Sequence, residues 1–134
     1  RPIEQSSEKI KKNGRVNIDL RLTSNPDILA WAGAHKTAGQ TLCGFAMETQ
    51  DLESNAAKKL TSKHCSMLVA NNLNTPGAGF AVDTNVVTVL KPGETTDEPI
   101  IEHWNKMSKQ ELAERILTEL AALRNTESAE SQAS

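Results

Sequence analysis

The sequence has little aromatic character, few cysteines and no long apolar run. Aromatic residues make up 3% of its 134 residues, and tyrosine is absent. No stretch approaches the length of a membrane span or contains the apolar core of a signal peptide, so we expect a cytoplasmic protein without a membrane partner. The net charge of −2 argues against a dedicated nucleic-acid binder, because such proteins usually carry a broad basic excess. Any basic function must therefore be local.

Metal-binding and nucleophile patterns are also missing. Cys43 and Cys65 lie in apolar surroundings without the spacing of metal ligands, and we interpret them as reduced core thiols, with a disulfide as the alternative. His35, His64 and His103 are scattered, without partner spacing for a metal or a catalytic triad, which indicates surface residues. The chain has neither a Walker loop nor a GxGxxG sequence. We therefore expect no metal site built from these residues.

What is present is an alternation of strand-like and helix-like segments. Residues 15–22, RVNIDLRL, alternate apolar and polar side chains and predict a half-buried strand. Residues 24–36 predict a helix with Asn25 as its N-cap and Pro26 as its first residue. Further strands are expected at 41–48, 65–72 and 85–91, and helices at 51–64 and, opened by a capping box, at 108–125.

This order of elements predicts an α/β domain with a sheet that is at least partly parallel. In such sheets ligands bind beyond the carboxyl ends of the strands, near helix N-termini. Residues 125–134 form a polar tail without apolar content, which we expect to be disordered.

Two segments near the N-terminus could bind an anion. Lys9, Lys11 and Lys12 crowd onto a loop that contains Gly14, where three ammonium groups could close over a polyphosphate. The alternative is a solvated turn. The NPDIL segment, residues 25–29, opens a helix whose unsatisfied N–H groups could bind an anion or the edge of a base, although it is also an ordinary helix start.

Two further groups follow the buried strands. Phe45 lies in the strand before a helix that carries Lys59 and Lys63 four residues apart, so an aromatic ring and two cations could form one wall of a nucleotide pocket. A core phenylalanine and two solvated lysines are the alternative. Asn71 and Asn72 end the next strand, where they could contact a ligand or simply form a turn.

In series, these segments resemble the C-terminal half of phosphopantothenate–cysteine ligase. In bacteria that enzyme is usually the second domain of a bifunctional flavoprotein that also contains phosphopantothenoylcysteine decarboxylase. The similarity runs through RP, KIKK, NPDILAW, GFAMET, AAKKLTSK, MLVANN, GAGF and DTNVVTVL. It implies a Rossmann-like, three-layer fold with a mostly parallel sheet, present here as a partial domain in residues 1–124.

The resemblance also implies a reaction in coenzyme A biosynthesis. CTP activates the carboxylate of 4′-phosphopantothenate as an acyl-cytidylate with loss of pyrophosphate, and the amine of cysteine then displaces CMP. Such chemistry requires positioned charges around phosphates rather than a protein nucleophile. The implied partners are CTP, 4′-phosphopantothenate, cysteine and a second copy of the chain, with which residues 15–22 could pair at a strand edge.

The resemblance assigns roles to individual residues. Lys9 is implied as the catalytic lysine over the triphosphate and the reacting carboxylate, with Lys11 and Lys12 supporting it. Asn71 is implied as a further supporting residue. Nucleotide binding is implied for a larger set: Lys9, Pro26, Asp27, Ile28, Leu29, Phe45, Lys59 and Lys63.

The sequence departs from the family in two ways. Met47, Asn72 and Ser66 replace residues that are usually alanine, aspartate and aspartate, and Met47 could reshape the pocket. The glycine-rich start, the acceptor-binding asparagine, the Mg²⁺-binding aspartate and the FMN-binding decarboxylase domain are all expected upstream of Arg1. We therefore expect the chain to need that portion and to be inactive alone.

Two other functions compete with a ligase. One is a non-catalytic nucleotide-binding or regulatory module, which would bind CTP by itself. The other is a general α/β interaction domain, in which Lys9, Lys59 and Lys63 would not be needed for nucleotide binding.

Overall fold

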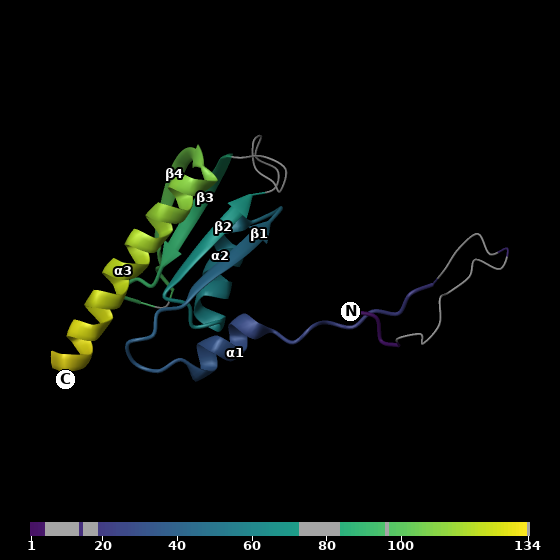
Figure 1. Cartoon of the computed structure of the whole chain (residues 1–134), viewed down its shortest axis with the longest axis horizontal. Coiled ribbons are helices and arrows are strands. Elements are labelled where there is room, and N and C mark those ends of the chain that lie inside the picture. Colours follow the sequence, from purple (N-terminus) through teal and green to yellow (C-terminus); the bar gives the residue numbers. More distant parts are fainter. Residues whose placement is uncertain (5–13, 15–18, 73–83, 96, 134) are drawn as a thin grey trace.

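The computed structural model describes residues 1–4, 14, 19–72, 84–95 and 97–133. Lys9, Lys11 and Lys12 lie outside these residues, so the triphosphate flap stays a prediction. Seven elements follow one another along the described chain (Figure 1): α1 Ile28–His35, β1 Cys43–Glu48, α2 Leu52–Ser62, β2 Met67–Asn72, β3 Thr84–Lys91, β4 Ile100–Ser108 and α3 Lys109–Ala133.

The four strands form one mixed sheet in the order β1-β2-β3-β4. β1 and β2 are parallel and are joined through α2, whereas β2 with β3 and β3 with β4 are antiparallel. The α/β class is confirmed, but the expectation of a mostly parallel sheet is wrong for these strands. For β3 and β4 the reason is their short connection, residues 92–99, which permits a hairpin but no crossover.

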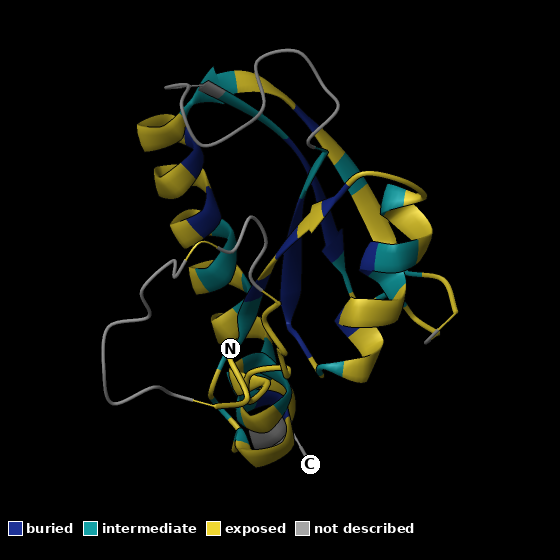
Figure 2. Ribbon diagram, turned by 90° about the vertical axis from the view of Figure 1, so that its right-hand side faces the viewer, coloured by how far each residue is buried: buried dark blue, intermediate teal, exposed yellow. Residues whose placement is uncertain are grey.

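Helices cover both faces of the sheet, which confirms three layers (Figure 2). Side chains alternate along β2, so that Leu68 and Ala70 face α2 while Met67 and Val69 face α3. All four are fully or almost fully buried. This two-sided burial explains why β2 is a continuous apolar run in the sequence.

β4 was missed by the sequence analysis, which assigned no element to residues 100–107. Of the residues in β4 only Trp104 is buried, so the strand shows no clean period of two. Its partner β3 carries the apolar residues Val87, Val89 and Leu90 that made it recognisable. The indole of Trp104 instead anchors β4 to the core between the sheet and α3.

The expected strand at 15–22 differs from the structure in its described part. Residues 15–18 lie outside the described residues, and Asp19–Leu22 contain only an isolated antiparallel bridge between Pro2 and Leu22. Leu20 and Leu22 are 66% and 65% exposed. These two leucines therefore lack the partner surface that a half-buried strand needs.

α3 begins at the predicted capping box. The Ser108 N–H donates to Glu111 Oε2 at 2.8 Å, and the Glu111 N–H donates to Ser108 Oγ at 3.1 Å. The helix continues to Ala133 and thus through most of the segment predicted to be a disordered tail. Once a helix is nucleated, extending it by one residue is far easier than starting it. No helix within the described ranges is both long and apolar enough to cross a membrane.

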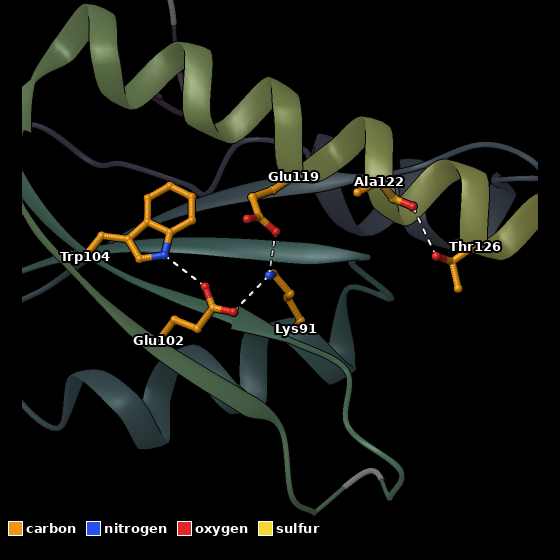
Figure 3. Close-up of polar contacts among 6 residues, drawn as sticks. All are labelled: Lys91, Glu102, Trp104, Glu119, Ala122 and Thr126. Carbon is orange, nitrogen blue, oxygen red and sulfur yellow. Dashed lines mark hydrogen bonds and ion pairs between the residues drawn. The ribbon is translucent and has the colours of Figure 1, made fainter.

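A partly buried lysine, Lys91, links the end of β3 to β4 and α3 (Figure 3). Lys91 Nζ donates to Glu119 Oε2 at 2.7 Å and to Glu102 Oε1 at 3.0 Å. The Trp104 indole N–H donates to the other Glu102 oxygen at 2.9 Å. That indole N–H and the Lys91 ammonium lower the pKa of Glu102. Burial acts to lower the pKa of Lys91, but the hydrogen bonds from its two glutamates outweigh burial and raise it.

The lowered pKa of Glu102 predicts a loss of stability in acid. The pKa of Glu102 is lower in the folded than in the unfolded chain. Glu102 therefore contributes its full stabilisation at a pH above its ordinary pKa of 4.5. That contribution declines as the pH falls from there through the folded-state pKa. We expect Glu102→Gln to flatten the fall of the unfolding free energy below pH 4.5, as measured by urea denaturation between pH 3 and pH 6. Equal slopes in both proteins would contradict this role.

Candidate functional site

The start of α1 brings one candidate site residue into position. Asp27 is the N-cap, and its Oδ1 accepts from the Ala30 N–H at 2.9 Å. The predicted cap at Asn25 is wrong, because the helix begins at Ile28 rather than at Pro26. The carboxylate therefore lies directly at the positive end of the helix dipole.

Lys63 meets Asp27 across 36 residues of sequence. Its ammonium forms a direct ion pair with Asp27 Oδ2 where the end of α2 reaches the start of α1. The hydrogen bond from Lys63, followed by that from Ala30, lowers the pKa of Asp27. Two segments that the resemblance assigned separately to the nucleotide thus come together here.

A glycine makes this approach possible. Gly33 is the buried residue of α1, and a Cβ placed on it would lie 1.8 Å from the backbone oxygen of Lys63. Only a residue without a side chain allows α1 to pack this closely against the end of α2. Gly33 was not singled out from the sequence, because a glycine in a helix gives no sign of what it packs against.

Lys59, one turn earlier on α2, pairs with a different carboxylate. Its Nζ lies 2.5 Å from Oε1 of Glu48, the last residue of β1. Asn55 Nδ2 donates to the Gln50 carbonyl at 3.0 Å and lies 3.5 Å from Glu48 Oε2. Glu48 is 9% exposed, so this carboxylate is held inside the α2 face of the sheet. Glu48 was not among the predicted site residues, although its alternation with the buried Ala46 along β1 was a usable signal.

Because the buried Glu48 carboxylate is paired with the Lys59 ammonium, the contribution of each side chain to stability should depend on the other. We expect Glu48→Gln to lower the unfolding free energy by about 1–2 kcal/mol, since the new amide keeps the size but loses the ion pair. A double-mutant cycle with Lys59→Gln, followed by urea denaturation, should give a coupling energy of roughly 1 kcal/mol. Additive effects would show that the two side chains do not stabilise each other.

Phe45 lies on the opposite face of the sheet from Glu48. It is 69% exposed and lines a cleft of about 220 Å³ with Met47, Val69 and Asn71, at the end of the sheet where α3 begins. The expected wall of Phe45 beside Lys59 and Lys63 is therefore not formed, because strand alternation turns the ring away from α2.

Asn71 is one of the polar residues of that cleft, together with Asn85 and Lys109. Its Oδ1 is buried and has no hydrogen-bond partner among the described residues. A buried amide oxygen without a donor is unfavourable, so this position favours an incoming N–H or O–H group. Asn72, one residue on, faces the α2 side and lines a separate cleft of about 630 Å³ with Thr88 and His103.

Ile28 is 79% exposed, whereas Leu29 packs against the core on the α2 face. Both cysteines are free, which confirms the reduced thiols, and burial raises the pKa of Cys43 to about 11. The three histidines are exposed, as expected. The described part of the chain contains no group of three or more His, Cys, Asp or Glu that could hold a metal ion.

Comparisons with known proteins agree with the resemblance at the level of a family. The family model for the DNA/pantothenate metabolism flavoprotein C-terminal domain matches residues 1–123. The coenzyme A biosynthesis bifunctional protein CoaBC of Bacillus subtilis (strain 168) is 43% identical over 114 residues, which cover 84% of this chain and 26% of that protein. A cysteine/cysteine sulfinic acid decarboxylase from an unknown prokaryotic organism is 37% identical over 123 residues, covering 91% of this chain and 32% of that protein.

Solved structures agree as well. The crystal structure of the C-terminal domain of a coenzyme A biosynthesis bifunctional protein CoaBC has a TM-score of 0.62 at 29% identity, covering 80% of this chain and 46% of that one. The chain thus spans about a quarter to a third of those two curated relatives and less than half of this solved domain. With a family model that matches 123 of its 134 residues, the chain belongs to the DNA/pantothenate metabolism flavoprotein C-terminal domain family.

Proposed function

We propose that the chain supplies much of the nucleotide site of a phosphopantothenate–cysteine ligase in coenzyme A biosynthesis. In this reaction the 4′-phosphopantothenate carboxylate attacks the α-phosphate of CTP and pyrophosphate leaves. The cysteine amine then attacks the acyl carbon of the acyl-cytidylate, and CMP leaves. Support comes from family membership and from the relatives named for coenzyme A biosynthesis.

The observation that carries the proposal is the meeting of Asp27 and Lys63. A carboxylate next to an ammonium offers one acceptor and one donor side by side, which matches the edge of a cytosine ring with its exocyclic amine as donor and its ring nitrogen N3 as acceptor. The N-terminus of α1 adds a positive potential beside them. We infer that nucleotide binding rearranges this ion pair, with Asp27 accepting from the base and Lys63 donating to it.

Lys59 would act on the same nucleotide. Its side chain is 45% exposed although its ammonium is held by Glu48, so it can reach an incoming phosphate or ribose without crossing the core. Lys9 would close over the triphosphate, with Lys11 and Lys12 supporting it. Mg²⁺ would require ligands from elsewhere, since the described residues offer no carboxylate cluster for it, and we assign it no step here.

An assay of the whole reaction tests this proposal. The chain is incubated with CTP, Mg²⁺, 4′-phosphopantothenate and cysteine, with and without the part of the solved CoaBC C-terminal domain that this chain does not cover. We expect phosphopantothenoylcysteine, CMP and pyrophosphate only when both polypeptides are present. Ligation by the chain alone would overturn the expected need for a second portion, and no ligation in any combination would overturn the ligase.

Two other functions remain distinguishable from a ligase. A non-catalytic nucleotide-binding or regulatory module would bind CTP without any ligation. A decarboxylase role is favoured by the relative that is 37% identical and is named for that activity. Release of CO₂ from cysteine or from phosphopantothenoylcysteine in the same mixtures would favour the decarboxylase. The two lysines paired with carboxylates favour the ligase, because decarboxylation involves no triphosphate.

A further inference from the structure

Glu48 is a buried carboxylate at the end of the sheet where ligands are expected. It is the last residue of β1, and it is 9% exposed. In open α/β sheets, ligands bind beyond the carboxyl ends of parallel strands such as β1 and β2. The side chain of its partner, Lys59, is 45% exposed. One member of this ion pair is therefore fixed inside the protein, while the other reaches solvent at the ligand-binding end.

Both oxygens of this carboxylate face a donor on α2. Lys59 Nζ donates to Oε1 at 2.5 Å, and Asn55 Nδ2 lies 3.5 Å from Oε2. Asn55 and Lys59 are four residues apart, so they lie on the same face of the helix. Asn55 is itself held by its hydrogen bond to the Gln50 carbonyl, which is 3.0 Å long. The carboxylate is therefore oriented from both sides, and the ammonium that it binds has a defined position.

Stability alone does not explain a carboxylate at this position. A buried ion pair loses the hydration of both charges, and apolar side chains of similar size often give an equally stable protein. The surrounding inward positions of β1 and α2 are indeed apolar, since Ala46, Ala56 and Leu60 belong to one buried cluster. Glu48 thus brings a charge to a face of the sheet that is otherwise packed with apolar side chains. A role in holding Lys59 accounts for that charge.

Lys59 can bind a ligand without leaving Glu48. An ammonium has three N–H donors, and the Glu48 oxygen accepts only one of them. A lysine on a flexible stem loses much of its rotational freedom when it binds a ligand. A lysine that a carboxylate already holds has lost that freedom beforehand, so its contact with the ligand costs less. The ion pair therefore prepares Lys59 for binding.

We propose that Glu48 is a positioning residue, which holds the Lys59 ammonium in place to donate to a phosphate or ribose oxygen of the nucleotide. The pair of Lys63 with Asp27 differs, because Asp27 is exposed and is itself a candidate nucleotide contact. Glu48 is covered, so it acts on the nucleotide only through Lys59. The inference rests on the proposed function for the identity of the ligand.

Calorimetric titration with CTP and Mg²⁺ tests this role in a double-mutant cycle. The chain is combined with the part of the solved CoaBC C-terminal domain that it does not cover, as in the ligation assay. Glu48→Gln should weaken CTP binding about tenfold, because Lys59 is no longer held. In a chain that already carries Lys59→Gln, the same change should alter the affinity by less than about twofold. A general structural effect of Glu48→Gln would instead weaken binding equally in both backgrounds.

Two further variants control for misfolding of Glu48→Gln. Asn55→Ala removes the second donor from the carboxylate and places a good helix former on α2, so it should fold. It should weaken CTP binding about threefold, again only when Lys59 is present. Glu53→Gln changes an exposed glutamate of the same helix and should leave the affinity within about twofold of the unmodified value.

A spectroscopic measurement on the chain by itself gives a readout without any nucleotide. The Lys59 ammonium, identified by its loss in Lys59→Gln, should give a resolved signal in proton–nitrogen NMR spectra, because its hydrogen bond to Glu48 slows proton exchange. Glu48→Gln should broaden that signal. An unchanged signal, or equal losses of CTP affinity in both backgrounds, would overturn this inference alone. If the unmodified protein did not bind CTP, the proposed function would fail and this inference with it.

Discussion

Replacing Gly33 with alanine should separate α1 from α2 and disrupt the candidate nucleotide site. The new methyl group would lie 1.8 Å from the Lys63 backbone oxygen, so one helix must shift. We expect the unfolding free energy to fall by about 2–3 kcal/mol, despite the better helix propensity of alanine. With the uncovered part of the CoaBC C-terminal domain present, the affinity of the chain for CTP should fall at least about tenfold, because Asp27 and Lys63 would no longer meet.

The neighbouring Ala34→Ser provides the control, since Ala34 is exposed on the same helix. It should change both stability and CTP affinity little, with an effect within about 0.5 kcal/mol. Urea denaturation and calorimetry measure the two quantities. If Gly33→Ala bound CTP as tightly as the unmodified chain, the packing of α1 against α2 would not matter for the nucleotide.

Removing the indole of Trp104 should cause the largest loss of stability. Trp104 is 3% exposed, and the Arg115 guanidinium lies 4.0 Å from the centroid of its ring. Its N–H also holds the Glu102 carboxylate that binds Lys91. Trp104→Ala leaves a cavity and removes the partner of both Arg115 and Glu102. We therefore expect the unfolding free energy to fall by about 3–5 kcal/mol in urea denaturation.

The second tryptophan of the chain serves as the matched control. Trp31 is 64% exposed, so Trp31→Ala should change the stability by no more than about 0.5 kcal/mol. Trp104→Phe keeps most of the apolar contact but loses the hydrogen bond. Its loss of stability should lie between those of Trp104→Ala and Trp31→Ala. A loss below about 1 kcal/mol for Trp104→Ala would contradict the place of Trp104 in the core.

The elements that the sequence predicted well are those whose pattern reflects burial directly. β2 is an apolar run because helices cover both faces of the sheet there, and α3 begins at a capping box made from local residues. β4 was missed because a strand that buries only Trp104 has no clear period. Likewise, residues 19–22 alternate without packing on any described surface.

The sequence named individual candidate residues, whose binding roles stay predictions, but it did not predict their arrangement. Asp27 and Lys63 were identified separately, and their ion pair depends on the fold between them. Phe45 was grouped with the lysines by its place in the chain, whereas the strand turns it to the other face. The buried partner Glu48 was overlooked because a charged residue at a strand end usually indicates solvent.

The central claim is that CTP binds where the start of α1 meets the end of α2. Binding of CTP to the chain, with the uncovered part of the CoaBC C-terminal domain present, tests it most directly. Calorimetric titration with CTP and Mg²⁺ compares the unmodified chain with Lys63→Ala and with Lys58→Ala, an exposed lysine on the same helix. We expect Lys63→Ala to weaken binding at least about tenfold and Lys58→Ala to leave it unchanged. Equal affinities in all three proteins would show that the nucleotide does not bind at the junction of α1 and α2.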